Sequence, residues 1–172
     1  FSNRADAAGL AYAQSECIQT AVISHKDFDS RESFCEALDA QLEDWGTELI
    51  CLAGYMRIHS DKFAQKWTGR MLNIHPSLLP LFPGLRVHQQ ALDAGVKVSG
   101  ATVHEVIPEL DAGPPVMQAV VPVLDTDDAD TLAARILKVE HQIYPLALKQ
   151  YIEKRPNNDV ESADQTALVW PN

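Results

Sequence analysis

Three polar side chains stand where apolar stretches of the sequence give way to loops. Asn73 and His75 close one such stretch just before Pro76, and Asp111 precedes Gly113 in a turn. Because side chains alternate along a strand, Asn73 and His75 are expected on the same face. An amide N–H can stabilise a developing oxyanion, an imidazole can move a proton near neutral pH, and a nearby carboxylate would orient the charged ring. If the three side chains meet, these residue types indicate proton transfer with oxyanion stabilisation.

Each residue also has a structural explanation. A histidine before a proline can be a loop residue, a strand-end asparagine can bond the backbone, and a turn aspartate can make an Asx-turn. His104, inside the alternating stretch 99–107, can be a second polar group of a site or a half-buried strand residue. Taken one at a time, the residues leave these alternatives open.

Other reaction classes have weaker support. Ser77 lacks the G-x-S-x-G context of a serine hydrolase, and the histidines and aspartates form no H-E-x-x-H or tight ligand cluster, so no metal is expected. Neither G-x-G-x-x-G nor G-x-x-x-x-G-K occurs, which leaves nucleotide binding without a direct signal. Arg31, Arg57 and Arg86 flank predicted elements, where an arginine can clamp a carboxylate or can simply be a solvated surface residue.

The elements that must position these residues alternate between strands and helices. This alternation predicts a single α/β domain with a mainly parallel, twisted sheet flanked by helices, in which ligands bind beyond the carboxyl ends of the strands. The predicted strands are 21–24, 48–53, 71–74, 99–107 and 116–123. The predicted helices are 6–15, one from the caps Asp29 or Ser30 with Glu32 to Gly46, a short one after Ser60, 87–94, and one from Thr126 or Asp127 to Tyr144, where Pro145 interrupts it before 146–152.

Composition narrows the class of partner. The 172 residues carry a formal net charge of −10, which argues against nucleic acid or an anionic membrane but allows a small anionic substrate held by a few arginines. Cys17, Cys35 and Cys51 are widely spaced, which fits reduced thiols in a cytoplasmic protein. Neither a membrane span of about 20 apolar residues nor a signal peptide is visible.

Five segments together share the order and spacing of one enzyme family. They are 51–58 (CLAGYMRI), 71–80 (MLNIHPSLLP), 100–104 (GATVH), 111–113 (DAG) and Gln118. The set closely resembles the folate-dependent formyltransferases, and among them phosphoribosylglycinamide (GAR) formyltransferase. The similarity runs from Phe1 to about Ile152, and Glu140-His141 with Tyr144-Pro145 resembles the last helix of that family.

The resemblance implies a Rossmann-like formyltransferase fold and transfer of a formyl group from 10-formyltetrahydrofolate, as co-substrate, to the amine of 5'-phosphoribosylglycinamide in purine biosynthesis. It implies that Asn73, His75 and Asp111 are the catalytic trio and that Glu140 binds the ribose hydroxyls. The folate-binding residues that it implies are Arg31, Met56, Arg57, Ile58, His59, Ile107, Pro108, Glu109 and Leu110.

Departures from the family pattern keep alternatives open. The first strand and Gly-Ser-Asn phosphate loop of the family should precede Phe1, so the expected domain, 1–153, is N-terminally incomplete, with 154–172 as a tail. Either an N-terminal segment precedes Phe1, as in a chain cut from a longer multifunctional purine enzyme, or the chain is a non-functional fragment. The first is expected, because the deletion would expose a long apolar sheet edge. The alternatives are a formyltetrahydrofolate hydrolase, which usually has a histidine where Pro76 stands, and a non-catalytic folate-binding module. The partners expected are the two small-molecule substrates, with the protein a monomer or weak homodimer.

Overall fold

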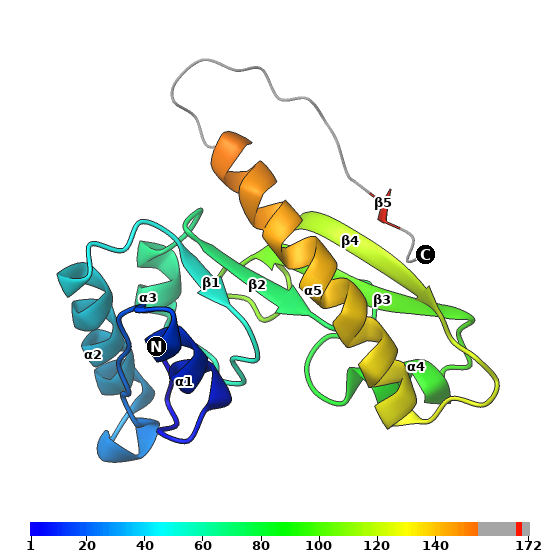
Figure 1. Ribbon diagram of the computed structural model, residues 1–172, viewed down its shortest axis with the longest axis horizontal. Coiled ribbons are helices and arrows are strands. Elements are labelled where there is room, and N and C mark those ends of the chain that lie inside the picture. Colours follow the sequence, from blue (N-terminus) through cyan, green and yellow to red (C-terminus); the bar gives the residue numbers. More distant parts are fainter. Residues whose placement is uncertain (155–167, 170–172) are drawn as a thin grey trace. The chain divides into compact units, whose positions relative to one another are not determined.

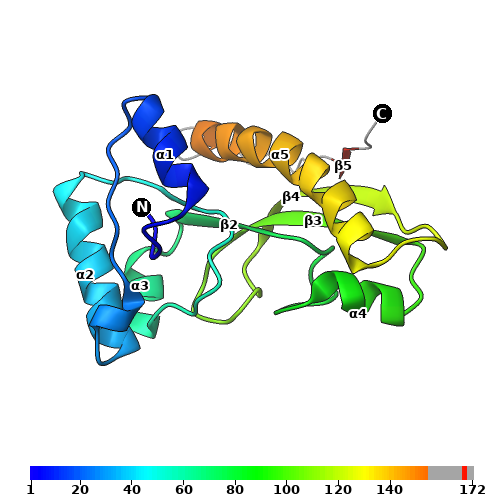
Figure 2. The same ribbon diagram turned by 60° about the horizontal axis from the view of Figure 1, so that its bottom comes forward.

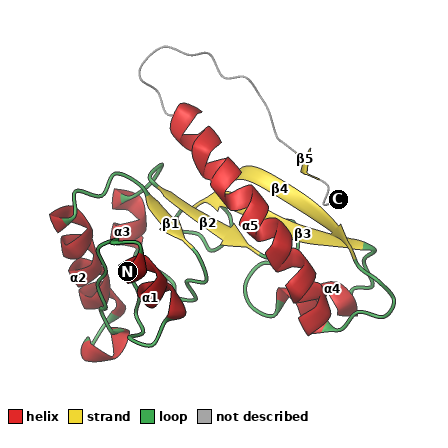
Figure 3. Cartoon of the chain, viewed as in Figure 1, coloured by secondary structure: helices red, strands yellow, loops and turns green. Residues whose placement is uncertain are grey.

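The computed structural model describes residues 1–154 and 168–169, which form two compact units (Figure 1). The first unit comprises residues 1–48 and 57–66, and the second comprises residues 49–56 and the described residues from 67 onward. Helices and strands are distinguished in Figure 3. The helices are α1 (Ala8–Ser15), the 3-10 helix η1 (His25–Asp27), α2 (Arg31–Asp44), α3 (Asp61–Lys66), α4 (Val87–Asp93) and α5 (Ala129–Lys154). The strands are β1 (Ile50–Leu52), β2 (Met71–His75), β3 (Val98–Glu105), β4 (Pro115–Pro122) and β5 (Leu168–Val169).

Helix α2 organises the first unit. It begins at Ser30, whose hydroxyl accepts the N–H of Ser33 at 3.0 Å while the Ser33 hydroxyl accepts the N–H of Ser30 at 3.3 Å. This reciprocal pair is a capping box, and Ser30 is one of the two predicted caps, but the box predicted between Asp29 and Glu32 is formed by Ser30 and Ser33 instead. The buried residues of α2 are Phe34, Cys35, Leu38 and Leu42. The strand expected over 21–24 is reduced to a single bridge between Ser2 and Val22.

The sheet of the second unit is mixed, which corrects the expectation of a mainly parallel sheet. Its order is β1-β2-β3-β4-β5. Strands β1 and β2 are parallel, as are β4 and β5, whereas β3 runs antiparallel to both β2 and β4. For β3 and β4 the reason is their connection, a loop without a helix, because such a hairpin joins antiparallel neighbours; β3 is also antiparallel to β2, although α4 lies between them in the chain. The α/β class itself is confirmed.

Helix α5 lies along one face of this sheet (Figures 1 and 2). Its buried residues recur every three or four positions and pack with small and branched side chains of β3 and β4. They are Leu132, Ile136, Val139, Ile143 and Ala147. The predicted interruption at Pro145 is wrong, because α5 continues through it to Lys154. A proline removes one backbone hydrogen bond, and the buried Ile143 and Ala147 on either side hold the helix against the sheet.

The opposite face of the sheet carries polar side chains. Cross-strand pairing sets Asn73 opposite His104 and His75 opposite Thr102. Alternating residues of the same strands, including Ala101 and Val103, belong to the apolar core under α5. The pairing register therefore gathers an amide, two imidazoles and a hydroxyl on one face.

Candidate active site

Asn73 and His75 end strand β2 with both side chains on the polar face. Asn73 is half-buried, and His75 is buried with 6% of its surface exposed. The Asn73 Nδ2 lies 3.2 Å from His104 Nε2 on the neighbouring strand. The sequence prediction that Asn73 and His75 share a face is confirmed by their pairing with His104 and Thr102.

Asp111 reaches this face because the loop after β3 folds back toward the sheet. Its backbone is left-handed, with φ of 53°, a conformation that aspartate tolerates better than most residues. Gly113 makes the fold-back possible, since a Cβ there would lie 1.7 Å from the carbonyl oxygen of Glu105. The Asp111 Oδ2 accepts the N–H of Gly84 at 2.8 Å, which anchors the carboxylate.

The carboxylate of Asp111 lies between the two imidazoles. Its Oδ2 is 3.6 Å from His75 Nδ1, and its Oδ1 is 3.9 Å from His104 Nε2. The side chains of His75 and Asp111 are 7% and 8% exposed, so water screens the interaction between the two groups only weakly. The structure thus brings together all three residues of the predicted trio, Asn73, His75 and Asp111.

Hydrogen bonds indicate different proton positions on the two rings. His104 Nδ1 donates to the Glu105 carbonyl at 2.9 Å, so a neutral ring offers Nε2 as the acceptor for the Asn73 amide. Burial lowers the pKa of His104, in agreement with a neutral ring, while the Glu105 carbonyl and the Asp111 charge oppose that shift. His75 Nε2 donates to the Phe82 carbonyl at 3.0 Å, which leaves Nδ1 facing Asp111. A charged His75 ring would therefore have an oxygen opposite each N–H.

This arrangement can stabilise negative charge and carry a proton. The Asn73 amide has two N–H groups, and the His104 contact uses one, so a second remains to donate to a substrate oxygen. His75 is held between a carbonyl and a carboxylate, which would let the ring change its protonation state without losing its position. His104 was weighed from the sequence as a possible second polar group, and its contacts with Asn73 and Asp111 favour that interpretation.

Glu140 lies half-buried on α5, in the same unit as the trio. Burial raises the pKa of its carboxyl, and the positive charges of His141 and His75 partly offset this. The predicted contact of Glu140 with ribose hydroxyls stays a prediction.

The predicted folate-binding residues fall in both units. Met56, which is 73% exposed, and the stretch 107–110, which leads into Asp111, belong to the second unit. Arg31, Arg57, Ile58 and His59 belong to the first unit. His59 is buried and stacks on Phe63 with ring centroids 4.7 Å apart. Their contact with folate stays a prediction.

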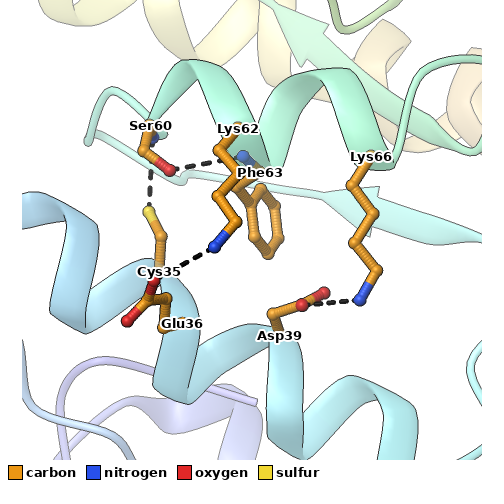
Figure 4. Close-up of a pocket in the computed structure, with 7 residues that line it drawn as sticks. All are labelled: Cys35, Glu36, Asp39, Ser60, Lys62, Phe63 and Lys66. Carbon is orange, nitrogen blue, oxygen red and sulfur yellow. Dashed lines mark hydrogen bonds and ion pairs between the residues drawn. The ribbon is translucent and has the colours of Figure 1, made fainter.

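A hollow between α2 and α3 in the first unit is lined by charged pairs (Figure 4). Lys62 Nζ lies 3.2 Å from Glu36 Oε1, and Lys66 Nζ lies 2.6 Å from Asp39 Oδ2. At its end the Cys35 sulfur accepts the N–H of Ser60 at 3.3 Å. These contacts join two helices, and we assign no chemistry to this hollow.

Two further properties concern metals and membranes. Within residues 1–154 and 168–169, no group of three or more His, Cys, Asp or Glu side chains is arranged to hold a metal ion. In the same part of the chain, every helix is too short or too polar to cross a bilayer.

Comparison with known proteins identifies the family to which this sequence and fold belong. Residues 1–148 match the formyl transferase family. The chain therefore belongs to the formyl transferase family, as its sequence motifs predicted.

Particular relatives narrow the position within the family. The chain is 44% identical over 155 residues to phosphoribosylglycinamide formyltransferase of Escherichia coli, covering 90% of this chain and 73% of that protein. It is 50% identical over 149 residues to trifunctional purine biosynthetic protein adenosine-3 of Bos taurus, which covers 87% of this chain but 15% of that protein. The match thus spans a small part of the trifunctional relatives.

Solved structures agree with this placement. Phosphoribosylglycinamide formyltransferase from Anaplasma phagocytophilum superimposes with a TM-score of 0.85 at 41% identity, over 99% of this chain and 83% of that one. The enzyme of the same name from Brucella melitensis gives a TM-score of 0.82 at 53% identity, over 95% of this chain and 82% of that one. At these identities the likeness covers the sequence as well as the fold, and the expected Rossmann-like formyltransferase fold is confirmed.

Proposed function

We propose that the protein transfers a formyl group from 10-formyltetrahydrofolate to the amine of 5'-phosphoribosylglycinamide in purine biosynthesis. The observation that carries this proposal is the convergence of Asn73, the buried His75 and Asp111 on one face of the sheet. Membership of the formyl transferase family and the names of the relatives support the same reaction.

The donor set fits a reaction in which a carbonyl oxygen becomes negatively charged. When the substrate amine adds to the formyl carbon, a C–N bond forms and the carbonyl electrons move to oxygen. Asn73 would donate an N–H to that oxygen, and the charged His75 ring would stabilise it further. A preorganised donor of this kind contributes about 3–4 kcal/mol in other enzymes.

Completion of the transfer requires one proton to move. As the bond from the formyl carbon to the folate nitrogen breaks, the attacking amine loses a proton and the folate nitrogen gains one. His75 is the group in this site that can give and take a proton near neutral pH. Asp111 would hold the ring in place and stabilise its charge from 3.6 Å.

Binding of the two substrates is assigned by the same proposal. Glu140 would accept hydrogen bonds from the ribose hydroxyls, and Arg31 would meet a carboxylate of the folate. The segments around 56–59 and 107–110 would line the pterin site. We also propose that the protein acts in the cytoplasm and, as the sequence predicted, as a monomer or weak homodimer.

A single assay separates this function from its alternatives. The full protein is incubated with 10-formyltetrahydrofolate, with and without phosphoribosylglycinamide, and release of tetrahydrofolate is followed. Release that requires the amine supports transfer, release without it indicates a hydrolase, and binding without release indicates a folate-binding module. Either of the last two results would refute the proposed transfer.

His75→Ala tests the role of the trio in the same assay. We expect kcat to fall by about 100-fold or more with little change in folate binding, because the ring would act in the transition state. His25→Ala is a matched control, since His25 is a half-buried histidine of the first unit that contacts the Asn3 amide at 3.1 Å. Near-normal turnover in His75→Ala would remove His75 from the mechanism.

A further inference from the structure

The segment after β2 determines how the His75 ring is held. His75 Nε2 donates to the carbonyl of Phe82, seven residues further along the chain. Phe82 has a φ of 56° and Arg86 a φ of 55°, so two residues of this segment adopt the left-handed conformation without being glycine. Such a conformation is unfavourable on its own and persists where surrounding contacts impose it. The contacts that fix this segment therefore also fix the acceptor for His75.

A buried polar network supplies these contacts from the neighbouring strands. The Thr102 hydroxyl donates to the Ser77 carbonyl at 2.7 Å and accepts the Leu79 N–H at 3.0 Å. The Ser77 hydroxyl in turn donates to the Leu81 carbonyl at 2.6 Å, one residue before Phe82. Thr102 and Ser77 are both 0% exposed, so water does not compete for these bonds.

Gln118 completes this network from strand β4. Its Nε2 donates to the Leu79 carbonyl at 2.9 Å and to the Thr102 hydroxyl oxygen at 2.9 Å. The Thr102 hydroxyl then makes one donation and receives two, which is its full capacity. Gln118 is the residue of the network farthest along the chain from His75, and it is paired across the strands with Thr102.

We propose that Gln118 is a positioning residue for His75. Through Thr102 and the backbone of Leu79, it holds the segment 77–82 in the conformation that presents the Phe82 carbonyl to the imidazole. Gln118 supplies the donor for the Leu79 carbonyl and a second donor for the Thr102 hydroxyl, and an unpaired buried acceptor would cost free energy. This role deepens the proposed formyl transfer, since it depends on His75 acting in that reaction.

The first test replaces Gln118 by methionine, which keeps the length of the side chain and removes both N–H donors. We expect kcat to fall by about 10- to 100-fold while KM for both substrates changes less than about threefold, because a displacement of the order of 1 Å at a catalytic group has effects of this size. Gln89→Met is the matched control, since the exposed Gln89 donates to Asp93 at 2.7 Å within α4. An unchanged kcat, or a change confined to KM, would overturn the proposal.

A second pair of variants keeps the test decisive if Gln118→Met folds poorly. Thr102→Ser retains the hydroxyl, whereas Thr102→Val has nearly the same shape without it. We expect Thr102→Ser to keep kcat within about threefold and Thr102→Val to lose about as much as Gln118→Met. In the double variant with Thr102→Val and Gln118→Met, the two losses should not multiply, because both remove the same support. Fully multiplicative losses would contradict the proposal.

A spectroscopic readout separates failure of this inference from failure of the proposed function. In protein labelled with ¹⁵N-histidine, the ring nitrogen signals of His75 report its hydrogen bond to Phe82. We expect these signals to shift in Gln118→Met and to stay unchanged in Gln89→Met, whether or not the protein transfers formyl groups. Unshifted His75 signals in Gln118→Met would overturn the positioning role even if activity fell.

Discussion

Replacement of Asp111 by asparagine isolates the charge of the carboxylate from its other contacts. Asparagine keeps the shape of the side chain, can still accept the N–H of Gly84, and tolerates the left-handed φ of 53°. With Asp111 Oδ2 and His75 Nδ1 separated by 3.6 Å, the attraction between unit charges is about 5 kcal/mol at an effective dielectric constant of about 20. The loss measured in kcat will be smaller, since the site can relax. We expect about 100- to 1000-fold, corresponding to about 3–4 kcal/mol.

The assay compares kcat, KM and thermal unfolding for Asp111→Asn and Asp111→Ala. Asparagine should lower kcat with KM for each substrate within about threefold and with little change in melting temperature. Alanine should lower kcat as well and should also destabilise the fold, because it loses the Gly84 contact and is less favourable in a left-handed conformation. If Asp111→Asn keeps more than about a third of the wild-type kcat, the coupling between this carboxylate and His75 is refuted.

Three further predictions concern stability and the shape of the site. Burial raises the pKa of the Glu140 carboxyl above its ordinary 4.5, so the native state favours the protonated form and loses stability as the pH rises. In chemical denaturation, Glu140→Gln should therefore be more stable than wild type at pH 7, and this gain should disappear below about pH 4. An equal gain at pH 7 and below pH 4 would refute the prediction. Burial lowers the pKa of His59 from 6.5 to about 4, so the stability that the neutral ring contributes is present above pH 6.5 and is lost on acidification. Between pH 7 and pH 5 this loss is about 2 kcal/mol in the free energy of unfolding. His59→Phe should keep the stacking on Phe63 and should lose about 2 kcal/mol less than wild type between pH 7 and pH 5, as parallel urea titrations would show. Gly113→Ala should lower kcat by about 10-fold or more and reduce the melting temperature, because the new Cβ would lie 1.7 Å from the carbonyl oxygen of Glu105. Gly9→Ala is the control and should be tolerated, because nothing lies within 4 Å of its Cβ. Equal behaviour of the two variants would contradict the role of Gly113.

Local sequence patterns predicted the elements around Asn73 and His75 well. The predicted strand before Pro76, the helix over 87–94 and the strands on either side of Asp111, of which 99–107 alternates, correspond to β2, α4, β3 and β4. These segments have strong periodicity and clear breakers, so local preferences and tertiary packing agree. The family resemblance rested on the same segments and is confirmed.

Other features depend on contacts between residues far apart in the chain. The direction of β3 follows from its pairing with β2 and β4, which no local pattern encodes. The continuation of α5 through Pro145 follows from burial of residues on both sides of it. Gln118 donates to the carbonyl of Leu79, which lies 39 residues earlier in the chain. The family motif included Gln118, but no local pattern could show which residues it contacts. Most of the predicted tail, 154–172, lies outside the described residues.

The most direct test of the site is a crystal structure of the full protein with a stable folate analogue that carries a tetrahedral, hydroxylated carbon in place of the formyl group. Such a group imitates the charge and shape at the moment when the amine has added. We predict that its oxygen lies within hydrogen-bond distance, at most about 3.2 Å, of Asn73 Nδ2 and within about 4 Å of the His75 ring, whose two nitrogens still face Phe82 and Asp111. An analogue bound in the protein with this oxygen more than about 4 Å from both side chains would contradict the assignment of Asn73 and His75 to the reaction.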